Sequence, residues 1–126
     1  MIQGIGVDVV DVERMKSILT DQGPAFIDRV FTDTEVTYCR SKQNPEQHFA
    51  ARFAAKEAVS KAMQTGWSGL FRWKDVEVVN QPSGAPKILL YNAVAQSLEK
   101  STVHLSLSHT ENTVVALAVI ESAHTH

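Results

Sequence analysis

Two charged residues, Glu57 and Lys61, stand four positions apart in an alanine-rich stretch that reads F-A-A-R-F-A-A-K-E-A-V-S-K-A-M-Q-T-G over residues 49–66. A helix at about 100° per residue places them one turn apart on the same face. A carboxylate beside an ammonium group can bind a metal ion and a phosphate, although such a pair is also common as a plain ion pair on a helix surface. The helix contains six alanines. They predict close backbone packing on most sides, so Glu57 is expected on an interior helix.

A second carboxylate, Asp8, lies in the N-terminal segment I-Q-G-I-G-V-D-V-V. Alternation predicts a strand over residues 2–10, with Asp8 on the same face as Gly4 and Gly6 and with three apolar residues on the other, namely Ile5, Val7 and Val9. The glycines leave space for a ligand or for a closely packed backbone. A buried carboxylate is costly unless a positive charge meets it, and a divalent cation held by Asp8 and Glu57 would meet both.

Other segments must position these residues. The central helix is expected to begin near Asn44 and Pro45, with Gln47 closing a capping pair, and to stop at Gly66. Asp11 predicts a helix to about Leu19. Further helices are expected from a capping box at 32–35 through about 41, and from Asn92 to about 100.

Strands are predicted over residues 75–80 and 87–91, around a turn at 81–86, and over 103–109 and 113–121 as a hairpin; residues 67–74 are expected to form a loop. The last strand is apolar on both faces, which predicts a central strand or one pressed against another subunit. Together these elements predict an α+β fold with a long central helix on a small, mostly antiparallel sheet.

Composition limits the class of protein. The 126 residues predict one domain over 1–121 and a frayed tail over 122–126. A net charge of -2 gives no general attraction to nucleic acid or to membranes. The single cysteine, Cys39, and the absence of a signal-peptide pattern fit the cytoplasm, and the apolar run 114–120 is too short to span a bilayer.

Three motifs carry a family resemblance: G-V-D at 6–8, R-F-A-A-K-E-A-V-S-K at 52–61 and S-H-T at 108–110. In this combination and spacing the chain resembles the phosphopantetheinyl transferases, in particular their small bacterial branch. The resemblance implies a long helix packed on a three-stranded sheet. It also implies a homotrimer with active sites at the subunit interfaces.

The implied reaction moves 4'-phosphopantetheine from coenzyme A to a serine of apo-acyl carrier protein and leaves adenosine 3',5'-bisphosphate. By resemblance, Asp8 and Glu57 would hold Mg²⁺ and would act in catalysis with Lys61, which would contact the pyrophosphate. Either Glu57 or a metal-bound water would accept the serine proton.

The resemblance extends to residues that bind coenzyme A and the carrier. It makes Arg52 a phosphate contact, although an interface salt bridge is the alternative, and it places Ser108 and His109 near the 3'-phosphate, although a solvated histidine is the alternative. Arg14 would dock acyl carrier protein. Three further cations either extend that patch or are simply solvated: Lys16, Arg40 and Lys42. His48 and His104 are expected to be structural. Residues 64–66 and 84–86 differ from the family's usual G-T-G and G-K-P loops.

Two other classes of function remain open on the same residues. One is another Mg²⁺-dependent phosphotransfer enzyme or phosphohydrolase that uses Asp8, Glu57 and Lys61. The other is a non-catalytic oligomeric binding module in which Glu57 and Lys61 form an interface pair.

Overall fold

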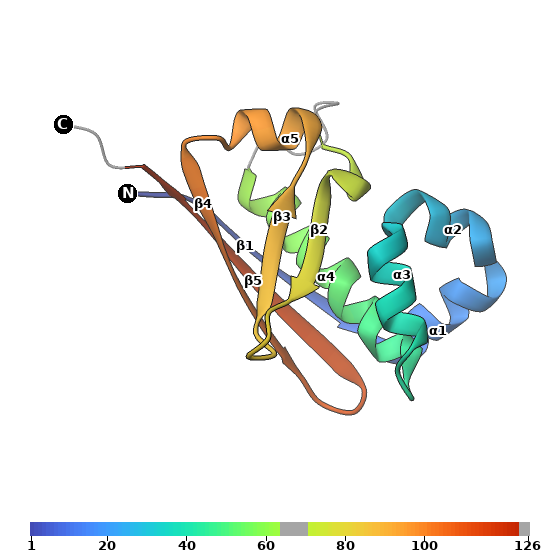
Figure 1. Cartoon of the computed structure of the whole chain (residues 1–126). Helices are drawn as coiled ribbons and strands as arrows, with labels where there is room; N and C mark the ends of the chain where they lie inside the picture. The colour runs from blue at the N-terminus through green and yellow to red at the C-terminus, as the bar shows by residue number, and fades with distance from the viewer. Residues whose placement is uncertain (64–70, 124–126) are drawn as a thin grey trace.

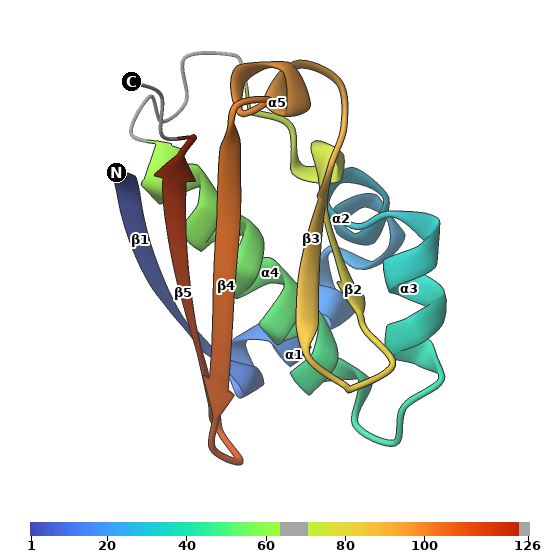
Figure 2. The same ribbon diagram turned by 60° about the vertical axis from the view of Figure 1, so that its left-hand side comes forward.

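Three antiparallel strands form the main sheet of the protein, in the order β1–β5–β4 (Figures 1 and 2). The structure, a computed structural model, describes residues 1–63 and 71–123. β1 is Ile2–Asp11, β4 is Ser101–His109 and β5 is Thr113–Ser122. β5 is the central strand, as its two apolar faces predicted. The fold is the expected α+β class.

One face of this sheet packs against the long helix α4, Pro45–Met63 (Figure 2). Small residues on both sides allow a close approach. A Cβ atom on Gly4 would lie 1.8 Å from the carbonyl oxygen of Ala62, and one on Gly6 would lie 2.0 Å from that of Ala58. The two glycines therefore make room for the backbone of α4, which decides between the two roles that the sequence left open.

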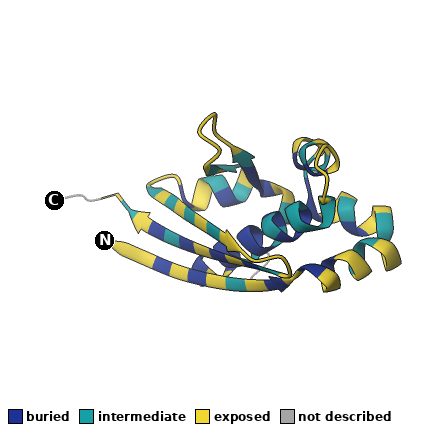
Figure 3. Ribbon diagram, turned by 90° about the horizontal axis from the view of Figure 1, so that it is seen from below, coloured by how far each residue is buried: buried dark blue, intermediate teal, exposed yellow. Residues whose placement is uncertain are grey.

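The opposite face of the sheet is apolar and open. Ile5, Val7 and Val9 are 52–62% exposed, and they alternate along β1 with the residues that face α4 (Figure 3). Val115 and Leu117 of the central strand are exposed on the same face. Isolated apolar side chains on a surface are ordinary, but a contiguous patch of this kind is typical of an interaction surface.

Three short helices pack around the N-terminal part of α4: α1 (Val12–Asp21), α2 (Gly23–Val30) and α3 (Asp33–Arg40). The predicted caps of α1 and α3 are confirmed. Asp11 Oδ1 accepts a hydrogen bond from the Glu13 amide at 2.9 Å, and Thr32 and Glu35 form a complete capping box at the start of α3. Phe31 packs edge-on against both Phe26 and Phe49, which joins α2 to α4.

The segment after α4 builds a second, two-stranded sheet from β2 (Val76–Asn80) and β3 (Pro86–Leu90). A short 3-10 helix, η1 (Trp73–Asp75), precedes it, and α5 (Asn92–Ser97) follows it. The prediction that Asn92 caps a helix to about residue 100 was wrong. Tyr91 is the N-cap, and Asn92 has a φ of 53° and donates its side-chain amide to Asp75 at 2.8 Å.

The ends of α4 differ in part from expectation. Pro45 is its first residue, as predicted, but the Gln47 side chain reaches the β4–β5 turn and does not close a capping pair. The predicted stop at Gly66 and the first half of the predicted loop 67–74 lie outside the described residues, and the end of that loop is the start of η1. β5 includes Ser122, the first residue assigned to the tail, and 124–126 are not described. No helix in the described part of the chain is long and apolar enough to cross a membrane.

Candidate active site

Asp8 and the charged face of α4 come together at the edge of the main sheet. The Lys61 ammonium group donates to Asp8 Oδ1 at 2.9 Å and to the Val7 carbonyl oxygen at 3.1 Å. The Asp8 side chain is 15% exposed, whereas that of Lys61 is 53% exposed. Lys61 thus forms its ion pair with Asp8 of β1 and not with Glu57, its neighbour one helical turn away.

Asp8 and Glu57 line one cavity of about 410 Å³ between β1, α1 and α4. Its apolar wall contains Phe53 from α4 and Ile18 from α1, and Arg14 adds a positive charge. The full lining is Asp8, Val9, Val10, Asp11, Arg14, Met15, Ile18, Phe53 and Glu57. One hollow therefore holds two predicted catalytic carboxylates and the predicted carrier-binding arginine.

The surroundings of Glu57 favour its uncharged form. Burial is the main cause of a raised pKa for Glu57, and the negative charge of Asp8 raises the pKa further. Lys61 acts in the opposite direction but does not cancel these effects. Two carboxylates that repel one another across a cavity are a common preparation for a bound cation or for proton transfer.

The donor set fits Mg²⁺ rather than a transition metal. The described part of the chain contains no group of three or more His, Cys, Asp or Glu side chains placed to hold a metal. Mg²⁺ does not need one, because it usually keeps several waters and takes one or two protein carboxylates together with substrate phosphates. Asp8 and Glu57, which line the same cavity, would supply two hard oxygen ligands.

A second group of predicted residues lies at the β4–β5 turn. Gln47 places its side-chain nitrogen 3.0 Å from His109 Nδ1 and 3.4 Å from the Thr110 carbonyl oxygen. The Gln47 amide nitrogen can only donate, so His109 Nδ1 accepts from it when the ring proton is on Nε2, whereas in the other tautomer Nδ1 donates to the Thr110 carbonyl oxygen, 3.4 Å away. Ser108 and His109 are exposed. Both contacts use Nδ1, which leaves Nε2 of His109 open to a ligand.

Arg52 projects from a different side of α4, where it is 4% exposed. Its Nη2 donates to Asn80 Oδ1 at 2.7 Å, and its guanidinium carbon lies 4.1 Å from the centre of the Tyr38 ring. Lys42 lies over the same ring at 4.7 Å. Burial lowers the pKa of His48, and Arg52, Lys42 and His109 lower it further in that order. Arg52 thus belongs to a positive cluster that extends to His109.

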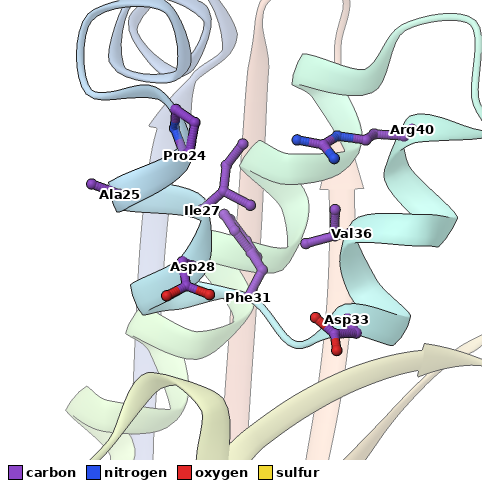
Figure 4. A pocket seen from close by; sticks show the side chains of 8 residues that line it. All are labelled: Pro24, Ala25, Ile27, Asp28, Phe31, Asp33, Val36 and Arg40. Carbon is purple, nitrogen blue, oxygen red and sulfur yellow. The ribbon is translucent and has the colours of Figure 1, made fainter.

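The remaining candidate cations, Lys16 and Arg40, are exposed. Arg40 lines a separate pocket between α2 and α3, where Ile27, Phe31 and Val36 form the apolar part and Asp28 and Asp33 lie at one end (Figure 4). None of the residues predicted for the metal or for coenzyme A lines this pocket. His104 lies on the outward side of β4, 3.0 Å from Glu121.

Sequence reasoning missed a buried ion pair between α4 and α3. Lys56 and Glu35 are both fully buried, with Lys56 Nζ 2.7 Å from Glu35 Oε1. Burial lowers the pKa of Lys56, and the neighbouring Glu35 opposes this effect. A signal was present, because at about 100° per residue Lys56 shares a side of the helix with Phe49 and Phe53, two residues that are typical of a core. Glu35 was recognised only as a capping residue.

Comparison with known proteins agrees with this site. Residues 4–118 match the model of the 4'-phosphopantetheinyl transferase superfamily. The holo-[acyl-carrier-protein] synthase of Koribacter versatilis is 44% identical over 124 residues, covering 96% of this chain and 99% of the relative. The enzyme of the same name from a Geobacter species is 42% identical with the same coverage.

Solved structures give the same result. The crystal structure of holo-[acyl-carrier-protein] synthase from Neisseria meningitidis superposes with a TM-score of 0.90 at 35% identity, over 97% of this chain and 100% of the other. The Bacillus anthracis enzyme, solved in complex with coenzyme A (3',5'-ADP), gives 0.84 at 34% identity, over 98% and 99%. The chain belongs to the 4'-phosphopantetheinyl transferase superfamily and, within it, to the holo-[acyl-carrier-protein] synthases.

Proposed function

We propose that this protein transfers 4'-phosphopantetheine from coenzyme A to a serine hydroxyl of apo-acyl carrier protein, in a reaction that depends on Mg²⁺. The observation that carries the proposal is the meeting of Asp8 of β1 with Glu57 and Lys61 of α4 beside one cavity that Arg14 also lines, although three helices separate β1 from α4 in the chain. The family to which the chain belongs supplies the reaction class.

In the proposed reaction the serine oxygen forms a bond to the phosphorus that carries the pantetheine arm. The bond from that phosphorus to the bridging oxygen of the pyrophosphate breaks, and adenosine 3',5'-bisphosphate leaves. Lys61 supplies positive charge to the pyrophosphate oxygens, as a compact ammonium group on a flexible stem does well. Glu57 would accept the serine proton as a general base from the wall of the cavity.

Asp8 and Glu57 are the residues that would hold Mg²⁺. When bound, this ion neutralises charge on the phosphate oxygens during transfer. The chain's own contribution is to keep both carboxylates on the wall of one cavity and to hold Asp8 in place through Lys61. The family's use of coenzyme A, seen in the B. anthracis complex, gives the diphosphate that would complete the site.

The nucleotide end of coenzyme A would bind at the positive cluster near the β4–β5 turn. His109 would donate to the 3'-phosphate through Nε2, and Ser108 lies beside it in the chain. Arg52 and Lys42 add positive charge around the Tyr38 ring. Arg52 also donates to Asn80 of the same chain, a contact that holds its side chain whether it binds phosphate or forms the alternative salt bridge at a subunit interface.

Acyl carrier protein is acidic in this family and would dock on α1. Arg14 is exposed at the cavity that holds the two carboxylates, so a carrier bound there would bring its serine close to Glu57. Lys16 of the same helix would extend the contact. Because exposed charges are screened by salt, the affinity for the carrier should fall as ionic strength rises.

The protein would act as a homotrimer of single-domain subunits, each comprising residues 1–121, in the cytoplasm. The open apolar face of the main sheet supports an assembly, since Val7, Val9 and Leu117 would otherwise remain in water. The active sites would lie at the subunit interfaces, as the family resemblance implies. A monodisperse monomer at micromolar concentration that is fully active would refute the trimer.

The test of function uses purified protein, apo-acyl carrier protein, coenzyme A and Mg²⁺, with mass spectrometry of the carrier. We expect the carrier to gain the mass of one phosphopantetheine group, and we expect a chelator to stop the gain. No mass gain on a carrier that a known synthase modifies would contradict the proposal.

The same experiment separates the other two classes of function. Cleavage of coenzyme A with no modification of the carrier would indicate a phosphohydrolase. An unchanged carrier together with unchanged coenzyme A would indicate a binding module.

A further inference from the structure

The first lysine of the K-E-A-V-S-K segment, Lys56, uses all three of its donors inside the protein. Its Nζ donates to Glu35 Oε1 at 2.7 Å, to the Trp73 carbonyl oxygen at 2.9 Å and to the Val76 carbonyl oxygen at 2.6 Å. These acceptors belong to three different elements, α3, η1 and β2. An ammonium group has three N–H donors, so Lys56 has none left for a substrate.

Glu35 is equally committed. Its Oε1 also accepts the Thr32 amide at 2.9 Å, and its Oε2 accepts the Val78 amide at 2.8 Å. A buried ion pair of this kind is weak evidence for stability, because desolvation of both charges offsets their attraction. A better-attested use of a buried polar pair is to specify one arrangement out of several that pack equally well.

Helix α4 needs such a specification. At about 100° per residue the six alanines of α4 lie within about 140° of its circumference, and Ala54, Ala55, Ala58 and Ala62 are buried on this side. Because alanine dominates this side, it presents a similar surface after a small rotation about the helix axis, so packing there opposes such a rotation weakly. Gly4 and Gly6 bring the helix close to the sheet. Lys56 supplies directional contacts on another side.

The rotation of α4 decides where Glu57 and Lys61 point. On a helix whose radius with side chains is about 5–6 Å, a rotation of about 20° moves a side-chain tip by about 2 Å. A misplacement of about 1 Å can already lower a catalysed rate by about 10²-fold. The Lys61–Asp8 contact of 2.9 Å would not survive a movement of that size.

A second connection runs through Trp73. Lys56 holds the backbone of Trp73, and the Trp73 ring stacks on Phe53 with the ring centres 5.3 Å apart at an interplanar angle of 22°. Phe53 lines the cavity that contains Asp8 and Glu57. Lys56 thus holds part of the cavity wall as well as the helix that carries Glu57.

We infer that Lys56 and Glu35 are positioning residues: they fix the rotation of α4 so that Glu57 and Lys61 face Asp8, and they touch no substrate. The inference deepens the proposed function, because the rate to be measured is that of carrier modification. The double variant Lys56→Met/Glu35→Gln replaces both members of the pair, so that neither charge is left without the other, and the nearby buried Glu77 keeps its hydrogen bonds from the Thr32 and Tyr91 hydroxyl groups. Leu98→Ala serves as a control of matched stability, because Leu98 is buried at the end of α5 and takes part in none of these contacts.

We expect the double variant to fold, to retain its KM for coenzyme A and to lose about 10²-fold in kcat, as expected for a misplaced catalytic group. Leu98→Ala should keep the kcat of the wild type at a temperature below both melting points. A double variant with wild-type kcat, or an equal loss in Leu98→Ala, would overturn the inference. If the double variant does not fold, Lys56→Arg keeps the charge but not the three-acceptor geometry, and it should show the same selective loss of kcat.

A crystal structure of the double variant gives a readout that does not depend on activity. We expect Lys61 and Asp8 to have moved beyond hydrogen-bond distance, and retention of the 2.9 Å contact would overturn the inference. An inactive wild-type protein would refute the proposed function, and the same structural comparison would still decide the role of Lys56.

Discussion

Replacing Gly6 by alanine tests how closely α4 must approach β1. The added Cβ would lie 2.0 Å from the Ala58 carbonyl oxygen and 2.7 Å from the Ala62 amide nitrogen. Both neighbours are helix backbone, which cannot turn away as a side chain can. Ordinary contact begins at 3.4 Å, so the strand and the helix must separate by up to 1.4 Å at this point.

That separation acts on both stability and rate. Overpacking of a core costs about 1–3 kcal/mol, which for a chain of this size lowers Tm by about 4–12 °C. Asp8 lies two residues from Gly6, so the movement also draws it away from Glu57 and Lys61. A shift of about 1 Å in a catalytic group can cost about 10²-fold in rate.

The measurements are Tm and the kcat for carrier modification, with Gly23→Ala as the control. Gly23 has a φ of +54° and nothing within 4 Å of an added Cβ, so alanine there introduces backbone strain without touching α4. We expect a lower Tm in both variants and a fall in kcat only in Gly6→Ala. A wild-type kcat in Gly6→Ala, or an equal fall in Gly23→Ala, would refute this account of the glycines.

Three further predictions follow from the charges. Folding raises the pKa of Glu57 above its ordinary value of 4.5, so without Mg²⁺ the free energy of unfolding of the wild type falls as pH rises from 4.5 through the raised pKa. Glu57→Gln lacks this titration, so the Tm of the variant minus the Tm of the wild type should increase over that range. A constant difference in Tm would contradict this. His109→Ala should raise the KM for coenzyme A more than that for its analogue without the 3'-phosphate, because a charge-assisted hydrogen bond is worth about 1.5–3 kcal/mol; equal losses would make His109 structural. Arg14→Glu should raise the KM for the carrier and leave that for coenzyme A unchanged, and equal effects on both would exclude a docking role.

The alternation in β1 was predictable because its consequence is local. A strand reverses its side chains at every residue, so Asp8 had to share a face with Gly4 and Gly6. Short-range capping signals were equally informative, as Asp11 and Thr32 show. Nothing in that pattern could decide whether the glycines made room for a ligand or for α4.

Contacts between distant segments were not predictable. Lys61 pairs with Asp8, 53 residues away, although the sequence offered Glu57 as the nearer partner. Glu35 and Lys56 each had a plausible local role, and only the packing of α3 on α4 brings them together. Asn92 carries a good capping side chain, but its bond to Asp75 competes with that use.

The central claim is that Asp8 and Glu57 form a metal-dependent transfer site with Lys61. The most direct test is the rate of carrier modification as a function of Mg²⁺ concentration, for the wild type and for Glu57→Gln. The wild-type rate should rise with Mg²⁺ to saturation, whereas Glu57→Gln should remain folded and should modify the carrier at least about 10²-fold more slowly at every concentration. A folded Glu57→Gln variant that modifies the carrier at the wild-type rate would contradict the claim.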